Sequence, residues 1–288
     1  MEIKYKFLDK SYIEQIHDCF IESFKDYNVD MSYMTLERMI SRGRMDRVDY
    51  SLSVGAFNNN HMIGFILIGI DKIDNKLTAF DAGTGVVEGY RGNGIAGKMF
   101  EFALARLKNI GVKKFSLEVI QDNKSAINAY QKAGFSIKRS FNCYKLNTSY
   151  NLDKFDPEHH IEIKSLTRDE LGNYLDILDW EISWEYNYSA ISNIKEDIII
   201  YGAFTESRCV GFIVFYPVLN WIFMLAVQSG YHDANIDSVL LTTLLKRISP
   251  DVVEIKFNNI PPEHSMNEFL KKSGFEVYIT QYEMEFNI

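Results

Sequence analysis

Apolar and polar residues alternate in the first half of the chain in patterns that predict both helices and strands. Ser11 and Glu14 have the spacing of a capping box, and apolar residues follow them at helical intervals. Further along, two apolar runs flank Asn58-Asn59-Asn60, whose side chains tolerate turn conformations, so we expect an antiparallel hairpin. The elements predicted here are a first strand near 1–7, helices over about 11–23 and 33–43, and strands over 51–57 and 62–70.

A glycine-rich turn at 91–96 separates a third strand from a longer helix. The strand covers about 77–87, and the helix runs from Gly94 to a stop at Gly111 with an apolar stripe along it. A strand over 115–120 then completes a strand–turn–helix–strand unit. The remaining elements predicted in this half are a helix over 124–133 that ends at Gly134, and two strands over 135–139 and 141–146.

Short motifs of the first half recur in the second half in the same order. Gly55-Ala56-Phe57 and Gly64-Phe65 recur 147 positions later as Gly202-Ala203-Phe204 and Gly211-Phe212. Lys132-Ala133-Gly134-Phe135 recurs 140 positions later as Lys272-Ser273-Gly274-Phe275. Two unrelated domains with similar turns are the alternative, and they would show no common order of elements. The repeat predicts two domains, 1–146 and 161–288, with a polar linker over 147–160.

Composition and charge limit the classes of partner. The 288 residues are 47% hydrophobic and 24% charged, as in ordinary globular proteins, and the net charge of −8 with no basic stripe argues against a nucleic-acid partner. Because no apolar run is long enough to span a bilayer and the N-terminus lacks an apolar signal segment, we expect a cytoplasmic protein without a membrane partner. Three scattered cysteines, Cys19, Cys143 and Cys209, predict neither a disulfide framework nor a zinc site.

The turn Arg91-Gly92-Asn93-Gly94-Ile95-Ala96 has the chemistry of an anion-binding site. Glycines let backbone amides approach a ligand closely, and the first amides of a helix carry an effective charge of roughly +0.5. Arg91 and Lys98 add positive charge. A Walker A motif is excluded because the turn lacks a Gly-Lys-Ser/Thr ending. Spacing alone does not exclude a dinucleotide fingerprint, but that fold opens with its glycine turn, whereas here an antiparallel hairpin precedes the turn.

Residues Val86 to Ala96 resemble motif A of the GNAT acetyltransferase superfamily, an Arg/Gln-x-x-Gly-x-Gly/Ala turn after a strand. Downstream, Asn123, Ala126, Tyr130 and Gly134-Phe135 resemble its motif B. The two motifs together cover most of the first domain. The resemblance implies an α/β, mixed α+β fold class with two tandem GNAT-like folds, each a central, mostly antiparallel sheet flanked by helices.

The resemblance also implies acetyl-CoA as co-substrate and assigns residues to it. In the superfamily the turn amides bind the pyrophosphate, while the strand before the turn pairs with the pantetheine arm through backbone groups, here those of Val86 and Val87. Asn123 would lie near the pantetheine, and Tyr130 would protonate the departing thiolate. Glu88 replaces a proline often found at its position. The cofactor-binding residues implied are Val86, Val87, Arg91, Gly92, Asn93, Gly94, Ile95, Ala96, Gly97, Lys98, Asn123 and Tyr130.

The reaction expected is direct attack of an amine on the thioester, with no metal. A lysine-like amine with a pKa near 10.4 must lose its proton at a cost of roughly 4–5 kcal/mol at pH 7, so a base or a water chain is needed. Asp81, Glu118 and Glu88 are candidate bases that the sequence does not rank. The acceptor pocket implied by the family would include Phe24, Tyr27, Tyr33, Arg42 and Arg44.

The second half has lost the coenzyme motif. Residues 232–237 align with the turn and contain neither glycine, while Asp233 and Asp237 add negative charge. Glu263 aligns with Asn123, and Leu270 aligns with Tyr130. We therefore expect this domain not to bind CoA and to have a structural, pocket-shaping or dimer-forming role. Its predicted strands are 198–204, 209–216 and 252–257.

Two groups of side chains in the second half have a structural and a functional interpretation. Trp180, Trp184, Tyr186 and Tyr188 are expected in a core or interface, with a lining role for the acceptor as the alternative. The histidines His159-His160, His232 and His264 are read as loop residues rather than metal ligands.

The sequence thus favours a small-molecule amine N-acetyltransferase. The alternatives are a protein or peptide N-acetyltransferase and a CoA-binding regulatory protein without catalysis. A homodimer is a possible state of assembly.

Overall fold

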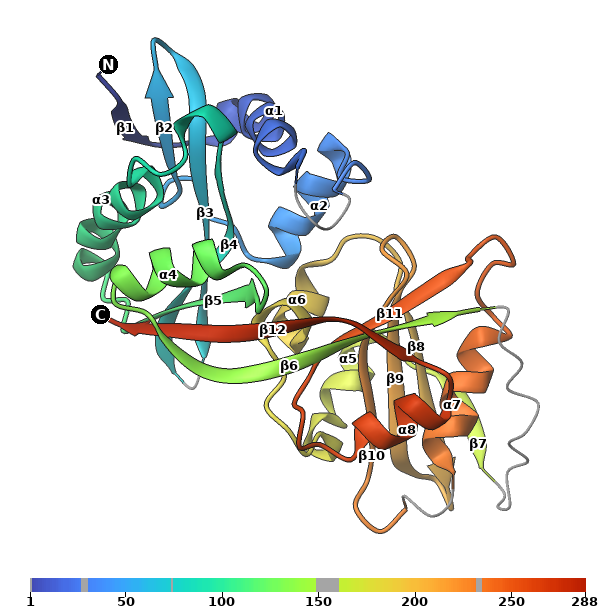
Figure 1. The fold of residues 1–288 in the computed structure, drawn as a ribbon. Helices are drawn as coiled ribbons and strands as arrows, with labels where there is room; N and C mark the ends of the chain where they lie inside the picture. The colour runs from blue at the N-terminus through green and yellow to red at the C-terminus, as the bar shows by residue number, and fades with distance from the viewer. Residues whose placement is uncertain (1, 27–30, 74, 149–160, 232–234) are drawn as a thin grey trace. The chain divides into compact units, whose positions relative to one another are not determined.

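The computed structural model describes residues 2–26, 31–73, 75–148, 161–231 and 235–288, which form two compact units (Figure 1). Unit 1 comprises Met1–Arg139 with Tyr282–Ile288, and unit 2 comprises Ser140–Gln281. This division differs from the boundary at 146 that the sequence predicts. Most of the predicted linker, 149–160, lies outside the described residues.

Unit 1 contains a sheet whose strands are mostly antiparallel. Its strand order is β1-β2-β3-β4-β5, followed by the end of β12 and the beginning of β6, and β4 with β5 is a parallel pair. The elements of the chain up to this point are β1 (Lys4–Phe7), η1 (Lys10–Tyr12), α1 (Ile13–Phe24), α2 (Leu36–Met45), β2 (Val54–Asn58), β3 (His61–Ile73), β4 (Lys76–Val86), η2 (Glu88–Tyr90), α3 (Ile95–Asn109), β5 (Lys114–Ile120), α4 (Lys124–Lys132) and β6 (Ser136–Asn147).

Helices cover both faces of this sheet. The apolar residues of α3 and α4, including Met99, Ala103 and Ile127, pack in one cluster against one face, and those of α1 and α2, such as Ile16 and Met39, pack in a separate cluster. The two faces are therefore chemically distinct, and a strand residue belongs to one or the other according to its position in the alternation.

Unit 2 repeats this plan. Its strand order is β12, β6, β11, β10, β9, β8, β7, and β10 with β11 is the parallel pair. The elements that follow β6 are β7 (Glu162–Ser165), α5 (Arg168–Gly172), η3 (Leu175–Ile177), η4 (Trp184–Tyr186), α6 (Tyr188–Asn193), β8 (Ile199–Thr205), β9 (Arg208–Tyr216), β10 (Trp221–Val227), α7 (Ile236–Leu245), β11 (Glu254–Ile260), α8 (Met266–Lys272) and β12 (Glu276–Asn287).

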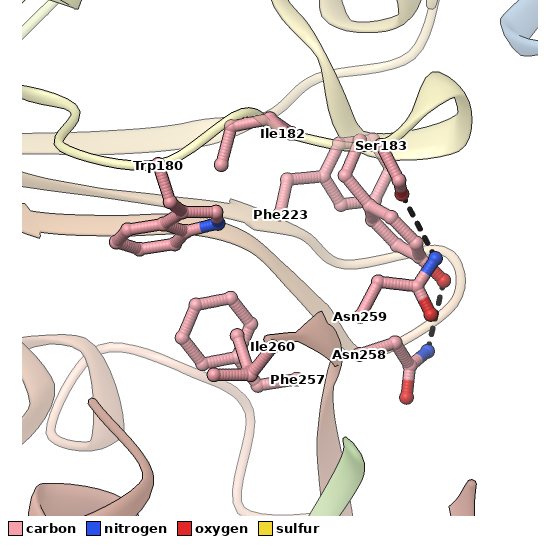
Figure 2. A pocket seen from close by; sticks show the side chains of 9 residues that line it. Trp180, Ile182, Ser183, Phe223, Phe257, Asn258, Asn259 and Ile260 are labelled. Atoms are coloured by element: carbon pink, nitrogen blue, oxygen red, sulfur yellow. Dashed lines mark hydrogen bonds between the residues drawn. The ribbon is translucent and has the colours of Figure 1, made fainter. Parts of the chain in front are cut away.

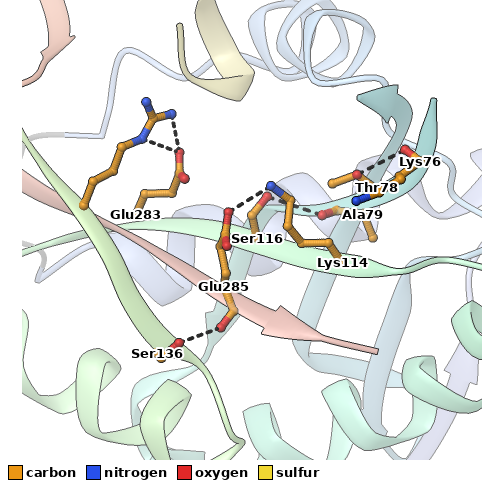
Figure 3. A network of polar contacts seen from close by, with 9 residues as sticks. Lys76, Thr78, Ala79, Lys114, Ser116, Ser136, Glu283 and Glu285 are labelled. Atoms are coloured by element: carbon orange, nitrogen blue, oxygen red, sulfur yellow. Dashed lines mark hydrogen bonds and ion pairs between the residues drawn. The ribbon is translucent and has the colours of Figure 1, made fainter. Parts of the chain in front are cut away.

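Two strands each contribute to both units. Strand β6 begins in unit 1 and then pairs with β11 of unit 2 through residues 142–147. Strand β12 begins in unit 2 and ends in unit 1, where Glu285 accepts a hydrogen bond from Lys114 at 2.8 Å and Glu283 pairs with Arg139 at 2.8 Å (Figure 3). The last residues of the chain thereby complete the sheet and the core of the unit that contains the first residues.

The sequence predicts most elements of the first half within a few residues, with two differences. The capping box of Ser11 and Glu14 does not form, because Asp9 accepts the hydrogen bond from the Ser11 amide and Tyr12 is the cap of α1. The two strands predicted over 135–139 and 141–146 are a single strand, β6. The hairpin is confirmed: β2 and β3 are antiparallel, with Asn59 and Asn60 at positive φ.

The repeated glycines have the same packing role in both units. A Cβ at Gly64 would lie 3.1 Å from the carbonyl oxygen of Gly85, and a Cβ at Gly211 would lie 2.8 Å from that of Ala226. At both sites the third strand of the meander crosses close to its neighbour beneath a helix. The sequence repeat therefore reflects one shared architecture. Within the described ranges, no helix is long and apolar enough to cross a membrane.

Because β12 begins in unit 2 and ends in unit 1, we expect the end of β12 to stabilise unit 1. Met284 is fully buried in the α3-side cluster, so Met284→Ala should lower the free energy of unfolding by about 2–5 kcal/mol in urea titrations. Val277→Ala, in the same strand but 43% exposed, should change it by less than about 0.5 kcal/mol. Equal effects of the two substitutions would contradict the assignment of the strand end to this core.

Candidate active site

The glycine-rich turn leads directly from β4, through η2, into α3. Gly92 and Gly94 have φ values of +78° and +72°, and Gly94 is the N-cap of α3 in the left-handed conformation. A Cβ placed on Gly92, Gly94 or Gly97 would meet no atom within 4 Å. The backbone conformation, and not internal packing, therefore requires glycine at 92 and 94, and the space over the start of the helix is open.

The start of α3 presents unpaired amide groups to this space. The first intrahelical hydrogen bond runs from the Lys98 amide to the Gly94 carbonyl at 3.0 Å, and no side chain caps the helix. The amides of Ile95, Ala96 and Gly97 precede that bond, so the helix itself offers them no partner. This is the donor set that a diphosphate requires, and the residues present fit it.

Arg91 and Asn93 fix the shape of the turn. The Arg91 guanidinium donates from Nε to the Val86 carbonyl at 3.0 Å and from a terminal nitrogen to the Ser23 carbonyl at 2.5 Å. Asn93 donates to the carbonyls of Tyr90 and Arg91 at 3.1 and 3.2 Å. Because both partners of Arg91 are neutral, its positive charge stays beside the turn, and Lys98 adds a second, exposed charge.

Strands β4 and β5 part next to this turn. Their parallel ladder runs from Thr78 opposite Lys114 to Asp81 opposite Leu117. Beyond it, the Val87 amide donates to Ile63 of β3 at 3.0 Å, so alternation turns the backbone groups of Val86 toward the side that β5 has left. Of the two valines implied by the family resemblance, Val86 is thus the one with backbone groups on the parted side. Val87 is 6% exposed and packs with the α1-side cluster.

Asp81 and Tyr130 meet at the point where the strands part. The Tyr130 hydroxyl lies 3.0 Å from Asp81 Oδ2, which also accepts from Thr84 Oγ1 at 2.7 Å, while Oδ1 accepts from the Gly83 amide at 3.0 Å. Asp81 is 7% exposed, and this burial raises the pKa of its carboxyl group, against the opposing effect of the three hydrogen bonds. Gly83 and Thr84 were not predicted. The glycines of β4 were the available signal, because glycine inside a strand marks a bulge or a close approach.

The other candidate bases lie elsewhere around the sheet. Leu117 and Val119 pack in the α3-side cluster, so Glu118 between them points to the opposite face, which α1 and α2 cover. Asp81 shares the face of its register partner Leu117. Glu88 is 59% exposed and pairs with Lys25 at 3.4 Å. The carboxyl groups of Asp81 and Glu118 therefore lie on opposite faces of the sheet.

Asn123 is the N-cap of α4. Its Oδ1 accepts a hydrogen bond from the Ala126 amide at 3.0 Å, a contact that fixes the start of the helix that carries Tyr130. A structural role for Asn123 is thereby visible, whereas its expected proximity to a pantetheine arm stays a prediction.

The residues expected around the acceptor make internal contacts. Phe24 stacks on Phe20 with ring centroids 4.7 Å apart, Tyr33 packs with the α1-side cluster, and Arg42 pairs with buried Asp46 at 3.4 Å. Tyr27 lies outside the described residues. The acceptor pocket stays a prediction.

Unit 2 keeps the backbone of the glycine-rich turn without its glycine and without its positive charge. Asn235 is the N-cap of α7 in the left-handed conformation, with φ +54°, at the position that Gly94 has in unit 1. The first turn of α7 contains Asp237 at the position of Ala96, and Val239 occupies the position of basic Lys98. His232 and Asp233 lie outside the described residues, as do His159 and His160.

Aromatic side chains fill the place where β10 and β11 part. Their ladder ends with Ile222 opposite Phe257. Next to it, Tyr186 stacks edge-on against Phe223 with centroids 5.4 Å apart and accepts from Asn258 at 2.9 Å, while Asn259 donates to Ser183 at 2.8 Å, around a small cleft (Figure 2). Trp184 and Tyr186 are 6% and 2% exposed, as expected for core residues. His264 pairs with Asp179 at 3.0 Å and stacks on Trp180.

The three cysteines are buried and free, and burial raises the pKa of Cys19 to about 12. Its thiol is therefore not a thiolate nucleophile at neutral pH. Among the described residues, no group of His, Cys, Asp or Glu side chains has the arrangement of a metal site.

Sequence comparisons identify relatives of the first unit. Residues 11–135 match the model of the acetyltransferase (GNAT) family. The chain is 32% identical over 93 residues to N-alpha-acetyltransferase 30 of Schizosaccharomyces pombe, a match that covers 32% of this chain and 62% of that protein. It is 26% identical over 108 residues to an uncharacterized N-acetyltransferase of Bacillus subtilis, covering 38% of this chain and 68% of that one. The match thus spans less than two thirds of the yeast relative.

Solved structures share the fold over nearly the whole chain. A tandem GNAT protein from the clavulanic acid biosynthesis pathway superposes with a TM-score of 0.75 at 16% identity and covers 99% of this chain and 98% of its own. A GCN5-related N-acetyltransferase from Sphaerobacter thermophilus gives 0.74 at 12% identity, with coverage of 99% and 95%. The expected fold class of two GNAT-like domains in tandem is confirmed, and residues 11–135 carry the sequence pattern of the acetyltransferase (GNAT) family.

Proposed function

We propose that this protein transfers the acetyl group of acetyl-CoA to a primary amine of a small molecule, by direct attack within a ternary complex. The observation that carries the proposal is the open helix start at Gly94, which the end of β4 connects with a polar pair, Asp81 and Tyr130, where β4 and β5 part. Backbone amides that bind a diphosphate and a proton donor for a thiolate are two of the groups that this reaction needs, beside a base for the amine.

The coenzyme-binding role rests on the turn and on Val86. The amides of Ile95, Ala96 and Gly97 would bind the diphosphate, with Arg91 and Lys98 adding positive charge, while Gly92 and Asn93 hold the turn in shape. The backbone of Val86, and less directly that of Val87, would pair with the pantetheine arm. Asn123 would hold α4 in place beside that arm.

The chemical roles rest on the two faces of the sheet. Glu118 points to the face of α1 and α2, where the family resemblance expects the acceptor, and would accept the amine proton directly or through water. The neutral amine would then attack the thioester carbonyl. As the carbon–sulfur bond breaks, Tyr130 would donate its hydroxyl proton to the sulfur, so that free CoA leaves as a thiol.

A peptide N-terminus is the second candidate acceptor. It is favoured by one observation, the 32% identity over 93 residues to a protein named N-alpha-acetyltransferase 30. A thiol-release assay with acetyl-CoA distinguishes the two: aminoglycosides, polyamines and amino acids represent the small amines, and short peptides with free or blocked N-termini represent the alternative. Turnover with free peptides alone would overturn the small-molecule proposal, and thiol release with neither class would overturn the enzymatic one.

Gly94→Asn tests the diphosphate cradle. Unit 2 has Asn235 in the same left-handed position, so the substitution should preserve the fold, but its side chain would occupy the space over the amides. We expect the Kd for CoA to rise at least about tenfold in calorimetry, because each 1.4 kcal/mol of lost contact is a factor of about 10.

Gly111→Asn is the matched control for this substitution. Gly111 also has positive φ, +86°, with no atom near an added Cβ, and it lies at the other end of α3. Its substitution should cause similar backbone strain and leave the Kd unchanged. The wild-type titration should give one CoA per chain; two would contradict the loss of binding in unit 2.

Tyr130→Phe tests the acid. It removes only the hydroxyl group, and general acids typically contribute about 10²–10⁴ in rate, so kcat should fall by about that factor while the KM for acetyl-CoA changes little. Tyr282→Phe, a half-buried tyrosine packed in the same cluster, should leave both constants unchanged. Equal turnover of Tyr130→Phe and wild type would remove the acid role.

A further inference from the structure

The carboxyl group of Asp81 is held in a cup of polar groups on the α4 side of the sheet. Its donors are the Gly83 amide, the Thr84 hydroxyl and the Tyr130 hydroxyl, all within 3.0 Å. This arrangement departs from the one expected for a base that takes a proton from the acceptor amine. Asp81 is almost fully buried, and one of its three hydrogen-bond partners is Tyr130, the candidate acid.

Unit 2 has the same backbone at this place, which allows a comparison within one chain. In unit 1, Ile68 of β3 faces Asp81 of β4, next to a bulge between Leu67 and Ile68. In unit 2, Phe215 of β9 faces Ile222 of β10, next to a bulge between Ile222 and Met224. The spacing of 147 from Ile68 to Phe215 equals that of the repeated Gly55-Ala56-Phe57 motif. The spacing of 141 from Asp81 to Ile222 equals that between the turn at 91–96 and residues 232–237.

The helix that carries Tyr130 aligns in the same way. The amide of Phe135 donates to the carbonyl of Tyr130 at 3.0 Å, and the amide of Phe275 donates to that of Leu270 at 2.9 Å. Both residues are shifted by 140 positions. Leu270 of α8 is therefore the structural counterpart of Tyr130 of α4.

The residues that form the polar cup correspond in unit 2 to residues with apolar side chains. Asp81, Gly83, Thr84 and Tyr130 correspond to a set of residues that are at most 1% exposed, namely Ile222, Met224, Leu225 and Leu270. This fold therefore packs well at the same place without any polar side chain. A buried carboxyl group is costly by comparison, so architecture does not account for Asp81. The carboxyl and the tyrosine occur together in the unit that has the glycine turn, and both are missing from the unit that lacks it.

We propose that Asp81 is a positioning residue that acts through Tyr130: it fixes the tyrosine hydroxyl where β4 and β5 part and replaces its proton as the thiolate leaves. This inference rests on the proposed acetyl transfer and assigns Asp81 a role different from that of amine base. As the carbon–sulfur bond breaks, its electron pair moves to sulfur. The sulfur takes the proton of Tyr130, and Tyr130 takes the proton of Asp81 Oδ2.

The surroundings of Asp81 suit both states of the carboxyl group. Burial raises the pKa of its carboxyl group. Before the transfer, the proposed step has this carboxyl group protonated, so that Oδ2 donates to the Tyr130 hydroxyl oxygen across the 3.0 Å contact instead of accepting from it. After the transfer, the carboxylate keeps two donors, the Gly83 amide and the Thr84 hydroxyl. The proton that the amine gave up returns to Asp81 through the base and solvent, which balances the cycle.

Asp81→Asn separates this role from a structural one. The amide can still donate to the Tyr130 hydroxyl, so the geometry is kept, but it cannot supply a proton. We expect kcat to fall about 10- to 100-fold, with the KM for acetyl-CoA and the calorimetric Kd for CoA unchanged. The rate is measured as thiol release with the best acceptor, or as hydrolysis of acetyl-CoA where no amine serves.

A double-mutant cycle provides the decisive readout. Because the two residues act as one donor, Asp81→Asn should have no further effect on kcat in the Tyr130→Phe background. Multiplicative effects of the two substitutions would overturn the proposal, as would wild-type turnover by Asp81→Asn. The pair Asp81→Ile with Tyr130→Leu copies unit 2 and should give a folded protein that binds CoA and turns over at the level of Tyr130→Phe.

The outcomes distinguish this inference from the function on which it rests. If wild-type protein binds no CoA and releases no thiol, acetyl transfer fails and the role of Asp81 fails with it. If wild-type protein is active and the cycle shows two independent effects, acetyl transfer stands and the coupling of Asp81 to Tyr130 is wrong.

Discussion

The parting of β4 from β5 beyond Asp81 is the constraint on which the candidate site depends. A continued parallel ladder would pair the backbone of β4 with β5 and leave nothing for a ligand. Because the ladder stops at Leu117, β5 does not pair with the backbone of Val86, and α4 can bring Tyr130 to the end of the ladder. The same strand then leads into the left-handed turn at Gly94, so one stretch of backbone connects the open start of α3 with the place where Asp81 meets Tyr130.

The two units show how one backbone can keep or lose such a site. Both have a parallel pair that parts early, a left-handed residue before the next helix, and a glycine under the crossing strand. In unit 2, Tyr186 and Phe223 pack against each other where the strands part, and Asn258 donates a hydrogen bond to the Tyr186 hydroxyl. Asparagine tolerates the left-handed conformation, which explains how Asn235 can adopt the backbone of the turn without a glycine.

Local patterns predicted the fold well, and long-range pairing was the part they missed. The motifs around Gly94 and Tyr130 consist of residues at fixed intervals along the chain. The turn and the resemblance to the family could therefore be identified from the sequence. The exchange of β6 and β12 could not, because it depends on which sheet edge each strand finds, and Met284 or Glu285 has no local signal for that choice. The contact of Asp81 with Tyr130 joins residues 49 positions apart on different elements, for the same reason.

The end of β12 makes unit 1 depend on a segment that follows unit 2 in the chain. Met284 and Phe286 fill the core of unit 1 beside Phe100 and Phe135, yet they follow all of unit 2 in the sequence. Unit 1 cannot complete its sheet until the chain has passed through unit 2, and ending the chain at Arg139 would remove the strand end that fills its core. Unit 2 therefore connects unit 1 with its last strand whatever side chains unit 2 carries at its own parting strands, and Ile222 and Leu270 show that the same backbone packs there with apolar residues alone.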